Sequence, residues 1–136
     1  MFGEKPSSKL AHRLLYAAFR GTRDEKELHR QLEDSAGKLA RRLGKFERSE
    51  FGELPKNEKT AASLAVCAAV ENLGIAKEDF TGSDVNEDGI YALLLPAAEK
   101  EWQSAYLSEA GEQYGKKFLR EVSRFLVATA PGLPDL

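Results

Sequence analysis

The chain has few of the residues that disulfide frameworks, metal sites and thiol nucleophiles require. Its 136 residues include one cysteine, Cys67, and two histidines, His12 and His29. A single cysteine forms no disulfide within the chain, and the spacing of the histidines does not match that of structural zinc sites. Cys67 stands in the apolar stretch AASLAVCAAV, which predicts a small buried core residue. We therefore expect no metal, no cofactor and no enzymatic role for this thiol.

Long apolar runs and nucleotide-binding strings are also missing. No apolar run approaches the about 18 residues that a membrane span needs, and the segment Met1 to Lys9 is short and polar, with no apolar region after it. These features predict a cytoplasmic protein without membrane contact. A GxxxxGK[ST] string is absent too, so the chain by itself does not bind a nucleoside triphosphate in the P-loop manner.

Signals for β-strands are equally scarce. The sequence shows no sustained alternation of apolar and polar residues and no two-residue hairpin turn. It instead predicts an all-α fold, a single compact bundle of five or six helices that occupies residues 1–136 as one domain. Within it, residues 1–21 carry an N-terminal helix from about Ser8 to Arg20, and residues 22–136 carry the rest. A longer helix is expected from Thr22 to about Phe46.

The middle of the chain is rich in alanine. A helix is expected from Pro55, at its first position, to Leu73. Within it the run from Ala61 to Val70 is apolar almost all round, which predicts a central helix surrounded by others. A brief helical turn is expected at AKEDF, and a helix from about Asn86 to Leu95 follows it. Pro96 then predicts the start of another piece that runs through Trp102 and Tyr106.

The segment DVNEDGIYALLL begins like a calcium-binding loop. Asp84, Asn86 and Asp88 fall at the first, third and fifth positions of such a loop, and Gly89 falls at the sixth. The twelfth position is Leu95, whereas calcium loops place a bidentate glutamate there. We therefore interpret the segment as the start of a helix with Asn86 as its N-cap.

The strongest helical pattern lies near the C-terminus. From Leu107 to Pro134 the sequence predicts one long amphipathic helix, with Ser108 as its N-cap and Pro131 marking its end. Glu109 and Glu112 fall in the first turn, where the helix dipole favours negative charge. One side is expected to be buried, and it carries Tyr114, Phe118, Val122, Phe125, Leu126 and Thr129.

Charge is divided unevenly along the chain. The residues before Ser49 include 12 Lys and Arg against 7 Asp and Glu, whereas the remainder has 8 against 15, and the whole chain has a net charge of −2. The basic residues alternate with acidic ones and have no aromatic residues between them, which argues against nucleic-acid binding. We expect the two halves to attract each other, either within the domain or across a partner surface.

Four aromatic residues are candidates for contact with a protein partner. Tyr16 and Phe19, together with Phe2, add apolar area to the first helix beyond what one small core is expected to bury. Trp102 and Tyr106 lie four residues apart, so a helix would place both on one side. For each pair, two interpretations are open: the side chains close the core, or they form an exposed anchor for a partner.

Several stretches occur in an order that resembles a known family. They are KELHRQLEDSAGKLARRL, EFGELPKNEKTAASLAVCAAVENLGI, KEDFTGSDVN and YLSEAGEQYGKKFLREVSRFLVATAPGLP. In this order and spacing the chain resembles the NACHT N-terminal helical domain, which precedes the NTPase in bacterial, notably actinobacterial, relatives of the animal NOD-like receptors. The resemblance covers about four fifths of the chain, from Glu27 to Leu136.

The resemblance implies the N-terminal part of a STAND-class immune NTPase, or a separate copy of that part. Such receptors are implicated in antiphage defence, in which a cue from infection releases autoinhibition and the NACHT module oligomerises. The family implies no catalytic residues for its helical domain. The expected function is therefore a non-catalytic protein-interaction module, whose partner is an adjacent NACHT NTPase domain or a second copy. The alternative is a stand-alone helical adaptor or regulator that binds an unrelated protein.

Overall fold

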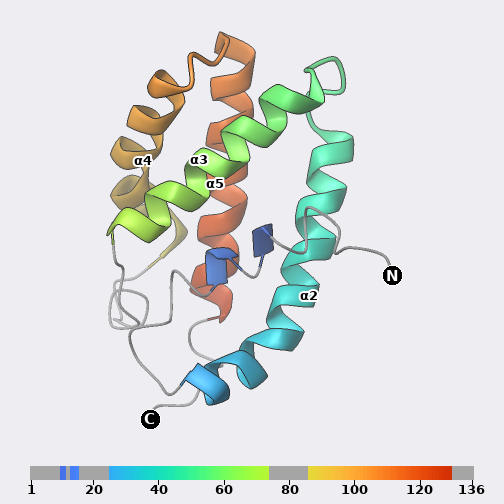
Figure 1. The fold of residues 1–136 in the computed structure, drawn as a ribbon, viewed down its shortest axis with the longest axis vertical. Coiled ribbons are helices and arrows are strands. Elements are labelled where there is room, and N and C mark those ends of the chain that lie inside the picture. Colours follow the sequence, from blue (N-terminus) through green and yellow to red (C-terminus); the bar gives the residue numbers. More distant parts are fainter. Residues whose placement is uncertain (1–9, 12, 16–24, 74–85, 130–136) are drawn as a thin grey trace.

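The computed structural model describes residues 10, 11, 13–15, 25–73 and 86–129, which form a helical bundle (Figure 1). Leu10 and the described residues up to Leu15 belong to the first helix that the sequence predicts. In these parts of the chain no strand is present, so the predicted all-α fold is confirmed. The further helices are α2 (Glu25–Ser49), α3 (Lys56–Leu73), α4 (Glu87–Ser104) and α5 (Glu109–Thr129).

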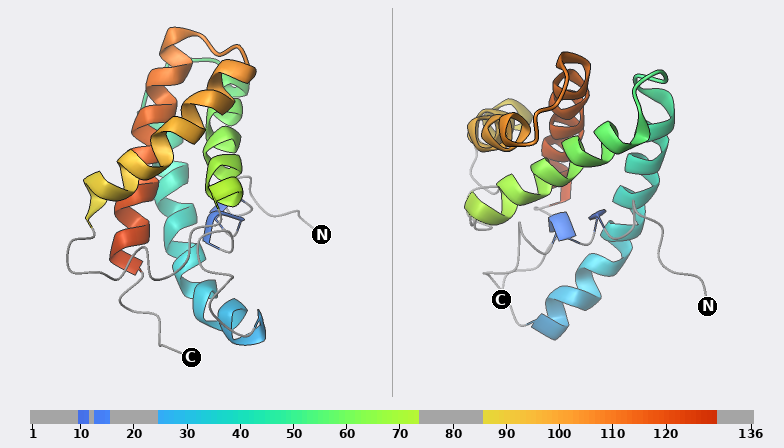
Figure 2. Two further views of the ribbon diagram at one scale, coloured as in Figure 1. Left: turned by 90° about the vertical axis from the view of Figure 1, so that its left-hand side faces the viewer. Right: turned by 45° about the horizontal axis from the view of Figure 1, so that its top comes forward.

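Helices α3, α4 and α5 pack against one another in all three pairs, and α2 lies along α5. In Figure 1, α3 crosses in front of α5, with α4 on one side and α2 on the other. The turn between α2 and α3 and the turn between α4 and α5 both lie at the upper end of this view, and Figure 2 shows the same arrangement from two other directions. One end of the bundle therefore presents two turns.

Helix α5 begins where the sequence predicts. The Ser108 hydroxyl accepts a hydrogen bond from the Gly111 N–H at 3.1 Å, and the Ser108 carbonyl accepts one from the Glu112 N–H at 2.9 Å, as expected of an N-cap. Five of the six side chains predicted to be buried are buried, and Thr129 is half-buried. The buried face is wider than predicted, because α5 contacts three helices, and it also includes Gly111, Gly115, Leu119 and Ser123.

Trp102 joins three of these helices. Its side chain is fully buried, and its indole N–H donates a hydrogen bond to the Ala62 carbonyl of α3 at 3.1 Å. On the other side the ring lies against α5, where a Cβ added at Gly115 would be 2.6 Å from the Trp102 Cε2 atom. A glycine at this position therefore lets α4 and α5 approach closely with the indole between them.

The prediction of a helix break at Pro96 is wrong, because α4 continues through this residue to Ser104. Pro96 and Ala92 are both exposed, so water reaches the Ala92 carbonyl that loses its helical N–H donor. The predicted start of the helix is confirmed, since the Asn86 side-chain oxygen accepts a hydrogen bond from the Gly89 N–H at 2.8 Å. Asn86 therefore acts as a helix cap.

The predicted bounds of the other helices shift by a few residues. Helix α2 ends at Ser49 rather than near Phe46. Pro55 precedes the first residue of α3, and its carbonyl accepts the hydrogen bond from the Lys59 N–H at 3.2 Å, which places Pro55 at the N-cap. The predicted AKEDF turn and the stop at Pro131 lie outside the described residues. None of the helices in the described ranges has the length and apolar character needed to cross a bilayer.

Candidate interaction surface

The structure separates the two aromatic residues that the sequence pairs on α4. Trp102 is a core residue with no exposed surface, so the prediction that it contacts a partner is wrong. Tyr106 lies beyond the end of α4, not on its side, and 93% of it is exposed. Tyr16 and Phe19 lie outside the described residues, and their predicted contact stays a prediction. Tyr106 is thus the described candidate that a partner is able to reach.

Tyr106 occupies a position where glycine is usually found. The chain leaves α4 at Ala105, after which the Tyr106 N–H donates to the Gln103 carbonyl at 3.1 Å and the Leu107 N–H donates to the Trp102 carbonyl at 3.4 Å. This pair of hydrogen bonds defines a Schellman motif, in which the residue after the cap is left-handed. Tyr106 has a φ of 55°, in the region that residues with a Cβ rarely adopt.

Phe51, in the neighbouring turn between α2 and α3, has a similar φ of 53°. Its ring packs edge-on against Tyr114, with centroids 6.1 Å apart, and the Lys117 Nζ atom lies 5.3 Å from its centroid. These contacts within the domain offset the backbone strain at Phe51. Tyr106 has almost no such burial, so its strain is not offset within the described part of the domain.

A groove connects the two turns. Its walls come from the α2–α3 turn, the start of α3 and the start of α5, and the residues lining it include Glu53, Pro55, Glu58, Ser108 and Ala110. The Glu58 carboxylate accepts hydrogen bonds from the Ser108 N–H at 2.9 Å and from the Ser108 hydroxyl at 3.1 Å. These two hydrogen bonds lower the pKa of Glu58 below its ordinary value. Glu58 therefore stays ionised at the N-terminus of α5 at neutral pH.

Further carboxylates lie at this end of the bundle, with Glu53 in the α2–α3 turn and Glu109 and Glu112 in the first turn of α5. Glu53 and Glu109 are exposed and Glu112 is half-buried, and among the described residues none of the three has an ion-pair partner. We call Glu53, Tyr106, Glu109 and Glu112 the tyrosine tip. It combines an exposed aromatic ring with three carboxylates, and both kinds of group bind arginine or lysine side chains.

A stripe of opposite charge runs along α2. Lys38, Arg41, Lys45 and Arg48 recur at spacings of three and four residues, so they lie on one side of the helix, and all four are exposed. Lys38 forms an ion pair with Asp34 at 3.4 Å. Arg41, Lys45 and Arg48 have no acidic partner in the part of the chain that the structure describes. We call these four residues the basic stripe.

Part of the predicted attraction between the basic and acidic halves lies within the domain. Arg13 pairs with Glu71 of α3, and Arg42 of α2 lies 3.8 Å from the Glu121 carboxylate of α5. The basic stripe takes no part in these pairs, and the ion pair of Lys38 with Asp34 lies within α2. The charges of Arg41, Lys45 and Arg48 are therefore available to a partner.

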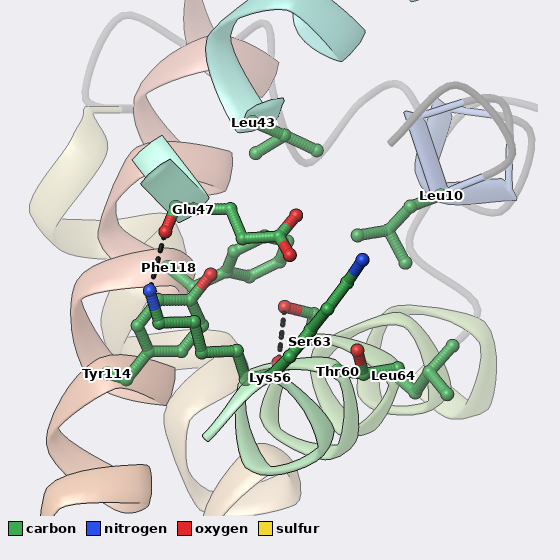
Figure 3. Close-up of a pocket in the computed structure, with 10 residues that line it drawn as sticks. Leu10, Leu43, Glu47, Lys56, Thr60, Ser63, Leu64, Tyr114 and Phe118 are labelled. Atoms are coloured by element: carbon green, nitrogen blue, oxygen red, sulfur yellow. Dashed lines mark hydrogen bonds between the residues drawn. The ribbon is translucent and has the colours of Figure 1, made fainter. Parts of the chain in front are cut away.

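A cavity opens where the first helix, α2 and α3 meet (Figure 3). Its volume is about 170 Å³, slightly more than the about 150 Å³ of an apolar cavity that holds benzene. Polar groups at its edge come from Glu47, Lys56, Thr60 and Ser63, and Leu64 at its rim is 44% exposed. The apolar lining consists of Leu10, Leu43, Leu64, Tyr114 and Phe118.

Lys59 closes one side of this cavity. It is only 7% exposed, and its Nζ atom donates a hydrogen bond to the Glu47 carbonyl at 2.6 Å, drawn as a dashed line in Figure 3. The same Nζ atom lies 5.5 Å from the centre of the Tyr114 ring. Because Glu47 is in the last turn of α2, the ammonium group compensates the negative end of that helix. This role of Lys59 could not be found from the sequence.

Two titratable side chains of the core have raised pKa values. Cys67 is buried, as predicted, and burial raises the pKa of its thiol to about 12. Burial also raises the pKa of Tyr114 to about 12. Within the described residues, no group of three or more His, Cys, Asp or Glu side chains is arranged to hold a metal ion. Among the described residues, the large apolar side chains that are exposed are Leu64, Leu93 and Tyr106.

These features define a small all-α domain whose helix ends are tied together by charged side chains. A family model described as NACHT N-terminal helical domain 1 matches residues 3–136, and the chain belongs to this family. The match includes the N-terminal segment that precedes the stretches of sequence resemblance. Neither the curated proteins nor the solved structures that were compared with the chain gave a match.

Proposed function

We propose that the chain is a non-catalytic interaction module of a NACHT-containing immune receptor that acts in the bacterial cytoplasm. It makes the contacts through which such a receptor is held inactive, oligomerises or signals during antiphage defence. The partner is the adjacent NACHT NTPase domain or a second copy of the module. Family membership supports the NACHT context. The contact surface that we propose for it is the tyrosine tip.

The exposure of Tyr106 is the observation that carries this proposal. A left-handed residue with a side chain carries about 1–3 kcal/mol of strain, and 93% exposure means that packing returns almost none of it. Glycine would relieve that strain in the same turn. A contact outside the domain gives the ring a function, and tyrosine is one of the residues that contribute most to binding at protein interfaces.

The test is co-purification of the chain with the NACHT NTPase domain of the same receptor, supplied on a separate chain. Replacing Tyr106 by glycine is expected to weaken this association by about tenfold or more, since an aromatic anchor is lost. Leu93→Ala is the matched control, because Leu93 is 45% exposed but lies in the middle of α4. Equal association of both variants with the NTPase domain would show that the tyrosine tip is not the contact.

The alternative is a stand-alone helical adaptor that binds an unrelated protein. The codons that follow Leu136 in the gene distinguish the two. A P-loop string encoded there would support the receptor, and a stop codon there, with no NACHT gene beside it, would support the adaptor. Tyr106→Gly remains informative in both cases, because the adaptor would also need an exposed contact residue.

A further inference from the structure

The basic stripe and the tyrosine tip are surfaces of opposite charge on different parts of one molecule. The stripe runs along α2 as far as Arg48 in its last turn, and the tip spans the α2–α3 and α4–α5 turns at the end of the bundle (Figure 1). From Lys38 to Arg48 the stripe extends over about 15 Å of helix. Neither surface has its charge neutralised within the described residues, apart from the pair between Lys38 and Asp34.

We infer that the basic stripe of one copy of this chain docks against the tyrosine tip of a second copy. This inference deepens the proposed function, on which it rests, because it chooses self-association among the possible contacts. Charge complementarity is the argument for a second copy as the occupant, since each molecule carries both halves of the contact. The net charge of the whole chain is only −2, so little overall repulsion opposes the approach of two copies.

The chemistry of the contact has precedents inside the domain. The Arg120 guanidinium lies 3.9 Å from the centre of the Tyr91 ring and also pairs with the Asp88 carboxylate at 2.5 Å. An arginine is thus held by an aromatic ring and a carboxylate together. The tyrosine tip offers the same two groups to Arg41 or Arg48 of the second copy, with Tyr106 as the ring and Glu109 as a carboxylate.

The two surfaces differ, so the contact is heterologous. Each added copy leaves one stripe and one tip unoccupied, and assembly continues until a ring closes or a filament grows. The contact consists mainly of exposed charges, so we expect it to weaken as salt screens them. Self-association is therefore expected to depend on both protein concentration and ionic strength.

Sedimentation velocity of the 136-residue chain tests this, from low micromolar to about 1 mM protein and at about 50 mM and about 500 mM salt. Association is expected at low salt and is expected to weaken at high salt. The stripe variant Arg41→Gln/Lys45→Gln should weaken the low-salt association about tenfold or more. The control Lys56→Gln/Lys100→Gln removes the same charge from exposed positions outside the stripe, and should change association by less than about twofold.

A tip variant, Glu109→Gln/Glu112→Gln, should weaken association to a similar degree. Because both residues stand in the first turn of α5, the helicity of this variant is checked by circular dichroism. Tyr106→Gly serves as a second tip variant. A mixture of the stripe variant and the tip variant should form a 1:1 dimer and nothing larger, since only one intact stripe and one intact tip remain. A mixture that stays monomeric would overturn the inference.

The inference would also be overturned by a wild-type chain that is monomeric at every concentration, or by self-association that does not change with salt concentration. Binding of the stripe to duplex DNA without any self-association would overturn it too. These outcomes leave the NTPase contact untouched. The wild-type chain could stay monomeric while Tyr106→Gly abolishes its binding to the NTPase domain. That result would refute docking of the stripe against the tip and support the proposed function. Self-association of the chain without any binding to the NTPase domain would support docking of the stripe against the tip and refute the contact with the NTPase domain.

Discussion

Glu58 and Lys59 are consecutive in α3, yet each binds the end of a different helix. The Glu58 carboxylate accepts two hydrogen bonds from Ser108 at the N-terminus of α5, and the Lys59 ammonium group donates to the Glu47 carbonyl near the C-terminus of α2. In both cases the charge opposes the sign of the helix dipole that it meets. The first turns of α3 therefore fix the positions of two neighbouring helices at the end that carries the tyrosine tip.

The contact of Glu58 makes stability depend on pH in a predictable direction. Ionised Glu58 is favoured in the fold, so its pKa is lower there than in the unfolded chain, where it is about 4.5. The contribution is complete above that pH and is lost as the pH falls through the lowered value. Wild type should therefore be more stable than Glu58→Gln at pH 6, and the difference should shrink at about pH 3.

Urea denaturation of both proteins at each pH measures this difference. Other carboxylates titrate in the same range, but they are common to both proteins and largely cancel in the comparison. A stability difference that stays constant between the two pH values would contradict the role assigned to the Glu58 charge.

A methyl group at Gly115 is expected to destabilise the domain. The new Cβ would lie 2.6 Å from the rigid Trp102 ring, and overpacking of this kind typically costs 1–3 kcal/mol, so it outweighs the about 1 kcal/mol gained from replacing a helical glycine. At Gly37 the nearest atom would be the flexible Arg41 Nη1 at 3.8 Å, an ordinary contact. Gly37→Ala should therefore stabilise by up to about 1 kcal/mol. Thermal unfolding measures the melting temperature of both variants. A shift in the same direction for Gly115→Ala and Gly37→Ala would contradict this prediction.

Tyr106→Gly should stabilise the isolated domain by about 1 kcal/mol, because glycine adopts the left-handed turn without strain. This corresponds to a rise in melting temperature of roughly 3–5 °C for a domain of this size. The same substitution is expected to weaken partner binding. A variant that gained stability and lost affinity would separate the two effects, whereas a loss of stability would mean that the Tyr106 ring supports the fold.

Cys67 should react slowly with thiol reagents in the folded chain. Burial raises the pKa of Cys67 from 9.0 to about 12, which lowers the thiolate fraction at pH 8 by about a thousandfold, and the side chain is also inaccessible. The rate of reaction with a disulfide reagent should therefore rise by at least this factor when urea unfolds the chain. Equal rates in the folded and unfolded states would place Cys67 at the surface.

The sequence predicted best those features that depend on neighbouring residues. The caps at Asn86 and Ser108 were found because a capping side chain bonds to the backbone only three residues away. The buried residues of α5 followed from their helical spacing, although its full buried face depends on the three helices around it. Pro96 was misinterpreted because its exposure, which makes it tolerable in a helix, is set by packing.

The candidate surface was predicted only in part. Tyr106 was identified as an aromatic candidate, but a left-handed turn is usually marked by glycine, and tyrosine gave no such signal. The burial of Trp102 depends on the space at Gly115, 13 positions further along the chain. The bond between Glu58 and Ser108 spans 50 positions, so nothing in the local sequence indicates it.

The burial of Trp102 has a practical consequence for spectroscopy. It is the single tryptophan of the chain, and its side chain is fully buried where α3, α4 and α5 meet. Its fluorescence therefore reports solvent entry into the interior of the bundle. Binding of a partner at the surface should leave the emission maximum of Trp102 unchanged, whereas unfolding should shift it. The two events are therefore distinguishable with this one intrinsic probe.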